Sequence, residues 1–416
     1  MSNNSNRKSL STAALACICL GYVCTINNVT LGAELGTHMT FVNAIITMIV
    51  GYVIISAMTV ANCMIGTKEN ATGKEIWCQT FGSAGGRIPS LIVTALMIFA
   101  AFFDYWYVGD VFKQFMPNHP GLGFVIGTIV VVLCAAIGSF WGTKSLKWLT
   151  RCLIPFAAGL MIVIIGNTIH QAGGMGPIVM TQPTEVFSFA HGLDIFLGGF
   201  MICVGLWPDL TMDAKKAKSV AIAVPIGMLM FFGLFLVGMF GAVGVGAYGI
   251  TPIAVRLGGA LFVLTNIFVI LAQASTVPSN THMITTEIVG NFPRVPAAAI
   301  IIGEPILAGL ASIAIEYGAD VSLISSWAGA NSILFSPIAG VTIAEYWIVN
   351  GGKFRFSLEN QPKFRGEALI VALIGVVVGA YFNFFNPILP ASLTAFVLAF
   401  VLHTILGKRN LSKQPA

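Results

Sequence analysis

The chain has 416 residues, of which 56% are hydrophobic and only 9% are charged. Soluble domains carry about 25% charged residues, so a chain this long with so few charges cannot cover a water-facing surface. The net charge of +5 comes mainly from short segments between apolar runs, which indicates membrane orientation and argues against a nucleic-acid partner.

Apolar runs of about 20 residues, the length that crosses a bilayer as a helix, recur twelve times. The predicted spans are 11–33, 38–62, 88–112, 122–140, 148–170, 190–209, 218–246, 258–288, 296–316, 321–347, 367–385 and 388–406. Arg7 and Lys8 precede the first run as in a signal peptide, but a convincing cleavage site is missing, so we expect a retained helix. The connecting segments are too short for a separate soluble domain.

The basic residues predict the orientation. With the N-terminus inside, only Lys113 and Arg256 of the 21 lysines and arginines fall outside, which leaves 19 on the inner side. Cytoplasmic loops carry this excess of positive charge. We therefore expect a multi-pass protein of the cell (inner) membrane with both termini in the cytoplasm.

The first and sixth runs contain polar residues and helix breakers near their middle. The first holds Thr25, Asn27 and Asn28, and the sixth holds Gly198 and Gly199 before Pro208. Irregular backbone at membrane depth is tolerated where it lines a cavity or is buried in protein. A spacing of five spans between two broken helices is typical of inverted repeats that meet at a substrate site. Packing kinks are the alternative interpretation.

This pattern predicts an all-α membrane protein built from two inverted repeats of five helices. From the N-terminus, the expected segments are a cytoplasmic tail (1–10), a first five-helix repeat (11–170), a second inverted five-helix repeat (190–347), two additional helices (367–406) and a cytoplasmic tail (407–416).

The eighth run carries a polar face. Its members are three or four residues apart, so they share one side of a helix: Ala272, Ser275, Thr276, Ser279 and Asn280. Hydroxyl oxygens are hard ligands that suit a small alkali cation, and Pro278 frees a backbone carbonyl. Hydroxyls that stabilise the helix itself are the alternative.

Three short elements lie at the ends of predicted spans. The sixth ends in Pro-Asp-Leu-Thr (208–211), the tenth in Pro-Ile-Ala-Gly-Val-Thr-Ile-Ala-Glu-Tyr (337–346), and Leu-Gly-Thr (35–37) follows the first. Together with the polar face of the eighth run, they resemble the nucleobase–cation symporter family, which includes the cytosine permeases and the hydantoin transporter. The sequence departs from the family after the first element, where Met212-Asp213 replaces the usual arginine.

The resemblance implies a leucine-transporter-like fold with the substrate between helices 1, 3, 6 and 8. It implies substrate contacts from the backbone of Gly199, the ring of Phe200 and the amide of Asn280. It also implies a sodium site in which Ala272, Ser275 and Thr276 face the break of the first helix at Thr25 and Asn28. Asn27 and Asn28 are further substrate-binding candidates at that break.

The third helix departs from the family, whose glutamine and tryptophan have no clean match here. The chain offers Asp104 and Trp106 instead, within Phe-Asp-Tyr-Trp-Tyr (103–107), and we include both in the expected substrate site. An acid inside an apolar span is costly unless it is functional or paired. Asp104 therefore favours a donor-rich or cationic solute, or it is a helix-packing acid.

These features predict a secondary transporter that imports a nucleobase or related small heterocycle by alternating access. The expected partners are this solute and the lipid bilayer, the expected coupling ion is Na⁺, and no organic cofactor is expected. The alternative is a proton-coupled transporter of a cationic amine or vitamin-like solute. An intramembrane enzyme is disfavoured, because no catalytic or metal-ligating cluster is apparent.

Overall fold

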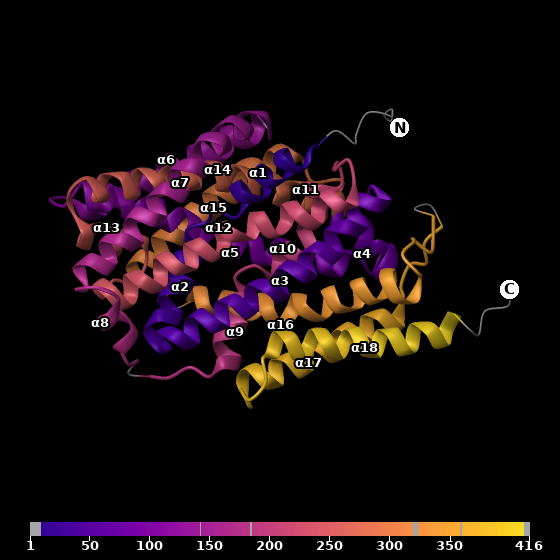
Figure 1. Cartoon of the computed structure of the whole chain (residues 1–416). Helices are drawn as coiled ribbons and strands as arrows, with labels where there is room; N and C mark the ends of the chain where they lie inside the picture. The colour runs from indigo at the N-terminus through magenta and orange to yellow at the C-terminus, as the bar shows by residue number, and fades with distance from the viewer. Residues whose placement is uncertain (1–9, 142, 184, 319–322, 358–359, 412–416) are drawn as a thin grey trace.

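A computed structural model of the chain describes residues 10–141, 143–183, 185–318, 323–357 and 360–411. The described secondary structure is helical except for one isolated bridge between Leu10 and Ala214. The long helices run side by side in a bundle (Figure 1).

The first half of the bundle consists of α1 (Thr12–Tyr22), α2 (Asn27–His38), α3 (Phe41–Glu69), α4 (Gly73–Phe81), α5 (Arg87–Phe115), α6 (Pro120–Trp141) and α7 (Thr143–Gln171). The second half consists of α8 (Met175–Met180), α9 (Phe189–Gly198), α10 (Met201–Leu206), α11 (Pro208–Thr211), α12 (Ala217–Val245), α13 (Ile250–Leu257), α14 (Gly259–Asn291), α15 (Ala297–Gly318) and α16 (Leu323–Ala344), which continues as a π-helical turn, η2 (Glu345–Val349). Two further helices follow, α17 (Gly366–Phe384) and α18 (Ala391–Leu411).

Ten described helices are long and apolar enough to cross a membrane, and the bent pair α1–α2 makes an eleventh span. The short helices α9 to α11 lie where the sixth span was predicted, and counting them as one broken span gives twelve. This confirms the all-α membrane fold. The predicted spans end several residues early in places, because helices such as α3 continue past the apolar run into polar residues that include Lys68 and Glu69.

Both predicted breaks are present. The bend between α1 and α2 measures 67°, and α9 is separated from α10 by Gly199 and Phe200. Both breaks therefore fall where polar residues or glycines interrupt an apolar run.

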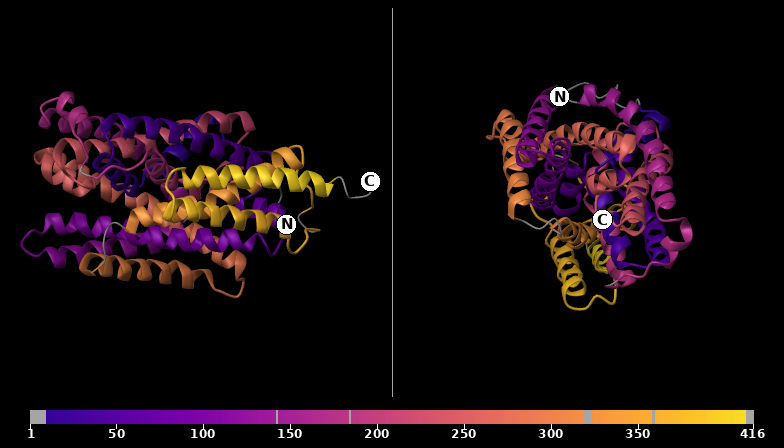
Figure 2. Two further views of the ribbon diagram at one scale, coloured as in Figure 1. Left: turned by 90° about the horizontal axis from the view of Figure 1, so that it is seen from below. Right: turned by 90° about the vertical axis from the view of Figure 1, so that its left-hand side faces the viewer.

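The start of α1 and the end of α18 lie at the same end of the bundle, at the right in Figure 1, with α4. The helices α8 and α13 lie at the opposite end. The additional helices α17 and α18 lie together on the outside of the bundle (Figure 2), where α18 packs on α16. Because α1 starts and α18 ends at the same end of the bundle, the number of spans is expected to be even.

Glycines bring α2 against α12 without an intervening side chain. A Cβ atom on Gly32 would lie 2.1 Å from the carbonyl oxygen of Phe235, and one on Gly238 would lie 1.8 Å from that of Val29. Small residues allow this close packing of helix backbones in membranes. The second half of the first broken helix, α2, is thereby fixed to α12.

The short helix α4 connects α3 to α5 and contacts the end of the sixth span. Thr72 and Glu75 form a capping box at its start, which satisfies two free backbone amides. The amide of Gly73 donates to Asp209 Oδ1 at 2.7 Å. The Pro-Asp-Leu-Thr element is therefore held by the connection between α3 and α5.

Candidate substrate-binding site

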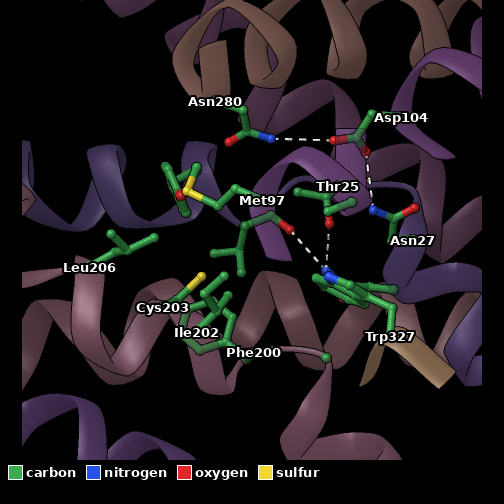
Figure 3. A pocket seen from close by; sticks show the side chains of 15 residues that line it. Thr25, Asn27, Met97, Asp104, Phe200, Ile202, Cys203, Leu206, Asn280 and Trp327 are labelled. Carbon is green, nitrogen blue, oxygen red and sulfur yellow. Dashed lines mark hydrogen bonds between the residues drawn. The ribbon is translucent and has the colours of Figure 1, made fainter. Parts of the chain in front are cut away.

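A pocket lies where the two broken helices meet α5, α14 and α16 (Figure 3). The break of the first helix and the break of the sixth supply two of its walls. Its lining residues are Tyr22, Val23, Thr25, Asn27, Asn28, Met97, Ala100, Asp104, Gly199, Phe200, Ile202, Cys203, Leu206, Asn280 and Trp327.

The non-helical backbone between α1 and α2 is stabilised by an asparagine side chain. Asn28 Nδ2 donates to the carbonyl oxygen of Val23 at 3.3 Å and to Thr25 Oγ1 at 3.0 Å. Backbone groups freed by a break inside a membrane need such partners. The polar residues noted in the sequence therefore stabilise the bend and also face the pocket.

The second break depends on Gly198 and its neighbours. A Cβ atom on Gly198 would lie 2.1 Å from the carbonyl oxygen of Ala328, so this position requires glycine. The carbonyl oxygen of Gly198 accepts a hydrogen bond from Asn331 Nδ2 at 3.2 Å. Phe200, directly after the break, is 2% exposed and contacts Trp207 edge to face at 4.9 Å.

Asp104 is the polar centre of the pocket. Its Oδ1 accepts hydrogen bonds from Asn27 Nδ2 at 3.1 Å and Gln273 Nε2 at 3.3 Å, and its Oδ2 accepts one from Asn280 Nδ2 at 3.3 Å. Figure 3 shows Asn27 and Asn280 pointing at the carboxyl from two sides. The carboxyl is 1% exposed, and no described basic side chain pairs with it.

The hydrogen-bonding groups around Asp104 determine which ligands the pocket can bind. Three amide donors favour negative charge on Asp104, and no described basic side chain pairs with it. The amide oxygens of Asn27 and Gln273 are buried without hydrogen-bond partners. Of these residues, Asp104 and Asn27 line the pocket, and their oxygens can accept hydrogen bonds from a ligand that carries N–H donors or positive charge.

Seven residues predicted for the substrate or the cation line this one pocket: Thr25, Asn27, Asn28, Asp104, Gly199, Phe200 and Asn280. Trp106 does not line it. Its Nε1 donates to Glu316 Oε2 of α15 at 3.0 Å, and Lys113 pairs with the same carboxylate at 2.5 Å. Trp106 is two residues from Asp104, about 200° around a helix, so the two side chains leave α5 on opposite faces.

Ala272, Ser275 and Thr276 are buried on α14 but do not line the pocket. Thr276 Oγ1 is buried without a hydrogen-bond partner. The described residues contain no cluster of three or more His, Cys, Asp or Glu side chains that could hold a metal.

Sequence reasoning did not identify several lining or supporting residues. Gln273 lies seven residues, two helical turns, before Asn280, and this spacing places both on one face. That signal was available in the sequence. Met97, Cys203 and Trp327 are apolar or aromatic residues within apolar spans, where nothing local separates a pocket wall from the core. Trp327 donates its Nε1 to the carbonyl oxygen of Leu96 at 2.9 Å.

Tyr22, the last residue of α1, and Leu206, the last residue of α10, line one side of the pocket. Polar contacts between α2, α5 and the segment around α13 lie beyond the break. Thr30 of α2 and Tyr107 of α5 share a hydrogen bond of 2.5 Å. Two more contacts join α2 and α5 to the segment around α13, Tyr248 with Glu34 and Thr251 with Asp110.

The sequence matches a known family over nearly its whole length. The profile of the family described as "Permease for cytosine/purines, uracil, thiamine, allantoin" matches residues 3–401. The cytosine permease of Escherichia coli (strain K12) is 22% identical over 400 residues, which cover 95% of this chain and 92% of that protein. The cytosine permease of Escherichia coli O157:H7 has the same identity and coverage.

Solved transporter structures share the fold. The inward-facing conformation of Mhp1 superposes with a TM-score of 0.81 at 18% identity, covering 99% of this chain and 94% of that one. Mhp1, a nucleobase-cation-symport-1 family transporter, in a closed conformation with bromovinylhydantoin bound gives 0.79 at 18% identity, covering 99% and 96%. A Na⁺-coupled sialic acid symporter gives 0.68 at 12% identity, covering 96% and 90%.

Proposed function

We propose that this chain, which belongs to the family of permeases for cytosine/purines, uracil, thiamine and allantoin, imports a nucleobase or related small heterocycle together with a cation. It is a multi-pass membrane transporter and not an enzyme. The proposed location is the cell's inner membrane, with both termini in the cytoplasm. The family named from the sequence is thus confirmed, while the solute and the coupling ion are the substance of the proposal.

The proposal rests on the hydrogen-bonded carboxyl of Asp104, which lies in a pocket also lined by aromatic side chains. A flat heterocycle has two faces that pack on aromatic rings and an edge with N–H donors and acceptors. Phe200 and Trp327 line the pocket, and Asp104 and Asn280 supply an acceptor and a donor at one edge. Asn27, Asn28 and the backbone of Gly199 complete the proposed substrate contacts.

Sodium is the proposed coupling ion. Its ligands would be neutral oxygens from the break of the first helix at Thr25 and Asn28 and from Ala272, Ser275 and Thr276. The buried, unpartnered hydroxyl of Thr276 supports this assignment. Binding there would tie the first helix to α14, so sodium would favour the conformation that accepts the solute.

Alternating access is the proposed mechanism. The pocket is lined on the side of α1 and α10, and polar contacts of α2 and α5 with the segment around α13 close the other side. Opening the α13 side requires those contacts to separate. Broken helices suit this exchange, since each half can move against its neighbours while the break stays at the substrate.

A second candidate function keeps the fold and changes the solute. Asp104 lacks a basic partner among the described side chains, so a cationic amine or vitamin-like solute would neutralise it directly. Such a transporter would be coupled to protons.

A thermal-shift screen of the purified chain separates the two candidates. Nucleobases, hydantoins and small amines are tested with sodium and with choline. A ligand that binds the folded state raises the unfolding temperature. Stabilisation by a nucleobase supports the first candidate, stabilisation by amines alone supports the second, and no stabilisation by any of them contradicts both.

A further inference from the structure

Glu304 is a second carboxyl buried at membrane depth, and it has no part in the transport scheme above. It lies in the first half of α15 and is 6% exposed. Thr281 of α14 donates its hydroxyl to Glu304 Oε2 at 2.7 Å, whereas Oε1 is buried without a hydrogen-bond partner. No ion pair with a described basic residue compensates it, and an isolated charge at this depth is costly.

Glu304 lies directly behind the substrate pocket. Thr281, its hydrogen-bond partner, follows Asn280 in α14, and Tyr105 follows Asp104 in α5. Asp104 of α5 and Asn280 of α14 therefore line the pocket, and the residue after each of them faces α15. Tyr105 is fully buried, and its hydroxyl also lacks a hydrogen-bond partner.

The two carboxyls differ in how well they hold charge. Asp104 accepts hydrogen bonds from three amides, and Glu304 accepts one from a hydroxyl. Hydrogen bonds to a carboxylate favour its charged form, and a neighbouring like charge disfavours it. Asn280, which bonds to Asp104, and Thr281, which bonds to Glu304, are consecutive residues of α14, so the two carboxyls lie on either side of this helix segment. The better-bonded Asp104 is accordingly assigned the charge, and Glu304 Oε1 is assigned the proton.

Few other titratable groups face Glu304. The packed helices around α15 are α5, α6 and α14. Helix α5 contributes Asp104 and Tyr105, and α6 contributes Cys134, which lies near Tyr105. Helix α14 contributes Thr281, which carries no charge. His282, the next residue of α14, is exposed and does not face Glu304. Among these described side chains, Asp104 is the only other carboxyl.

We propose that Glu304 is a proton-binding site coupled to the substrate pocket through the charge of Asp104. A ligand or cation that neutralises Asp104 removes the repulsion that keeps the proton on Glu304. Pocket occupancy and proton occupancy then affect each other by the same factor. The proton site stands independently of the proposed function, whereas its use in transport rests on it. It is separate from the proposed sodium site, which uses neutral oxygens.

Infrared spectroscopy of the purified full chain tests the site without a substrate. We expect a protonated-carboxyl carbonyl band at neutral pH that Glu304→Gln removes and that the control Glu316→Gln, an acid on the same helix paired with Lys113, leaves in place. In Asp104→Asn the band of Glu304 should disappear at a lower pH than in the parent, because the opposing charge is gone. Full band intensity in Glu304→Gln, or an unchanged titration in Asp104→Asn, would overturn the proposal.

Should Glu304→Gln fail to fold, Thr281→Val provides the test. Losing the hydroxyl donor should move the carbonyl band of a protonated Glu304 to higher frequency. An unmoved band would show that no protonated carboxyl accepts from Thr281, and this would also overturn the proposal.

Uptake of radiolabelled cytosine into proteoliposomes tests the coupling. Because a bound solute lowers the proton occupancy of Glu304, solute entry should be linked to proton exit. At constant sodium, an outward proton gradient should therefore accelerate uptake by the parent and not by Glu304→Gln. Equal acceleration in both, or none in the parent, overturns the coupling to transport. Absence of any cytosine uptake would count against the proposed function, and the infrared titration would still decide the proton site.

Discussion

Asn280 of α14 and Asp104 of α5 are 176 positions apart in the sequence, yet the amide nitrogen of Asn280 lies 3.3 Å from Asp104 Oδ2 inside the pocket. This contact joins one helix of each half of the chain at the point where the two broken helices meet. A ligand that pairs with either side chain therefore contacts both halves, and its binding is sensitive to their relative movement.

The charge of Asp104 is expected to select the solute. Asp104→Asn keeps the shape and removes the only acid among the lining residues. We expect the variant to bind the substrate at least about tenfold more weakly, since an N–H donor or a cation loses a charge-assisted hydrogen bond of about 1.5–3 kcal/mol. Equilibrium binding measures this change.

The control is Glu316→Gln on α15. Glu316 pairs with Lys113 outside the pocket, so its variant should keep the parent's affinity for the substrate. Parent-like binding by Asp104→Asn would exclude a role for the charge in selection.

Sodium should tighten substrate binding if the proposed cation site is correct. Exchange of sodium for choline at fixed pH and ionic strength should lower the parent's affinity. Ser275→Ala and Thr276→Ala should reduce this sodium dependence more than they reduce binding in saturating sodium. Reciprocity requires that substrate tighten sodium binding by the same factor.

Thr265→Ala is the matched control for the sodium site. Thr265 is also a buried threonine of α14 without a hydroxyl partner, but it lies three turns from Thr276. Its variant should keep the sodium dependence of the parent. An affinity unchanged by choline in the parent itself would rule out the sodium site and favour proton coupling.

A buried charge cluster is expected to hold the two additional helices to the bundle. Glu345 is 2% exposed and bonds to Arg365 before α17, with an Nη2–Oε2 distance of 3.1 Å, and to His403 of α18 at 2.7 Å. Glu345→Gln should lower the free energy of unfolding by about 3–5 kcal/mol, because it leaves a buried arginine without its counter-ion.

Thermal and denaturant unfolding in detergent measures this loss. The control is Glu367→Gln, which removes a partly exposed carboxylate 3.4 Å from the same arginine and should cost about 0–1 kcal/mol. Equal losses in the two variants would contradict a special role for Glu345.

The orientation of the chain can be tested with fused reporters. We expect reporters after Gly173 and Gly318 to report outside and those after Gly73 and Gly352 to report inside, following the distribution of basic residues. The structure agrees in part, since α8, directly after Gly173, and α4, which begins at Gly73, lie at opposite ends of the bundle (Figure 1). A swap within either pair would break the twelve-span topology.

The sequence predicted the elements that leave a local mark. Thr25 to Asn28 and the Gly198–Gly199 pair interrupt apolar runs, and an interruption at membrane depth has few structural explanations other than a break. Asn280 was visible as a polar residue on a helix face. These features come from hydropathy and periodicity, which need no knowledge of neighbouring helices.

Features that depend on contacts between helices were not predictable in this way. The polar contact of Trp106 is Glu316 on α15, and only its spacing from Asp104 hinted that it could not share the pocket face. Trp327 lines the pocket from α16 because that helix crosses the break of the sixth span. An aromatic residue in an apolar run gives no local sign of such a position.

The central claim is that the pocket around Asp104 and Asn280 binds a nucleobase-like heterocycle. Equilibrium binding of radiolabelled cytosine to the purified chain tests it most directly, with Asn280→Ala and Phe200→Ala as site variants and Ser279→Ala as the neighbouring control. Ser279 bonds to its own helix at the carbonyl of Ser275 and does not line the pocket. We predict saturable binding by the parent and the control. We predict binding about tenfold to hundredfold weaker in Asn280→Ala, since an unpaired buried polar edge costs about 1–3 kcal/mol. Parent affinity in both site variants would contradict the claim.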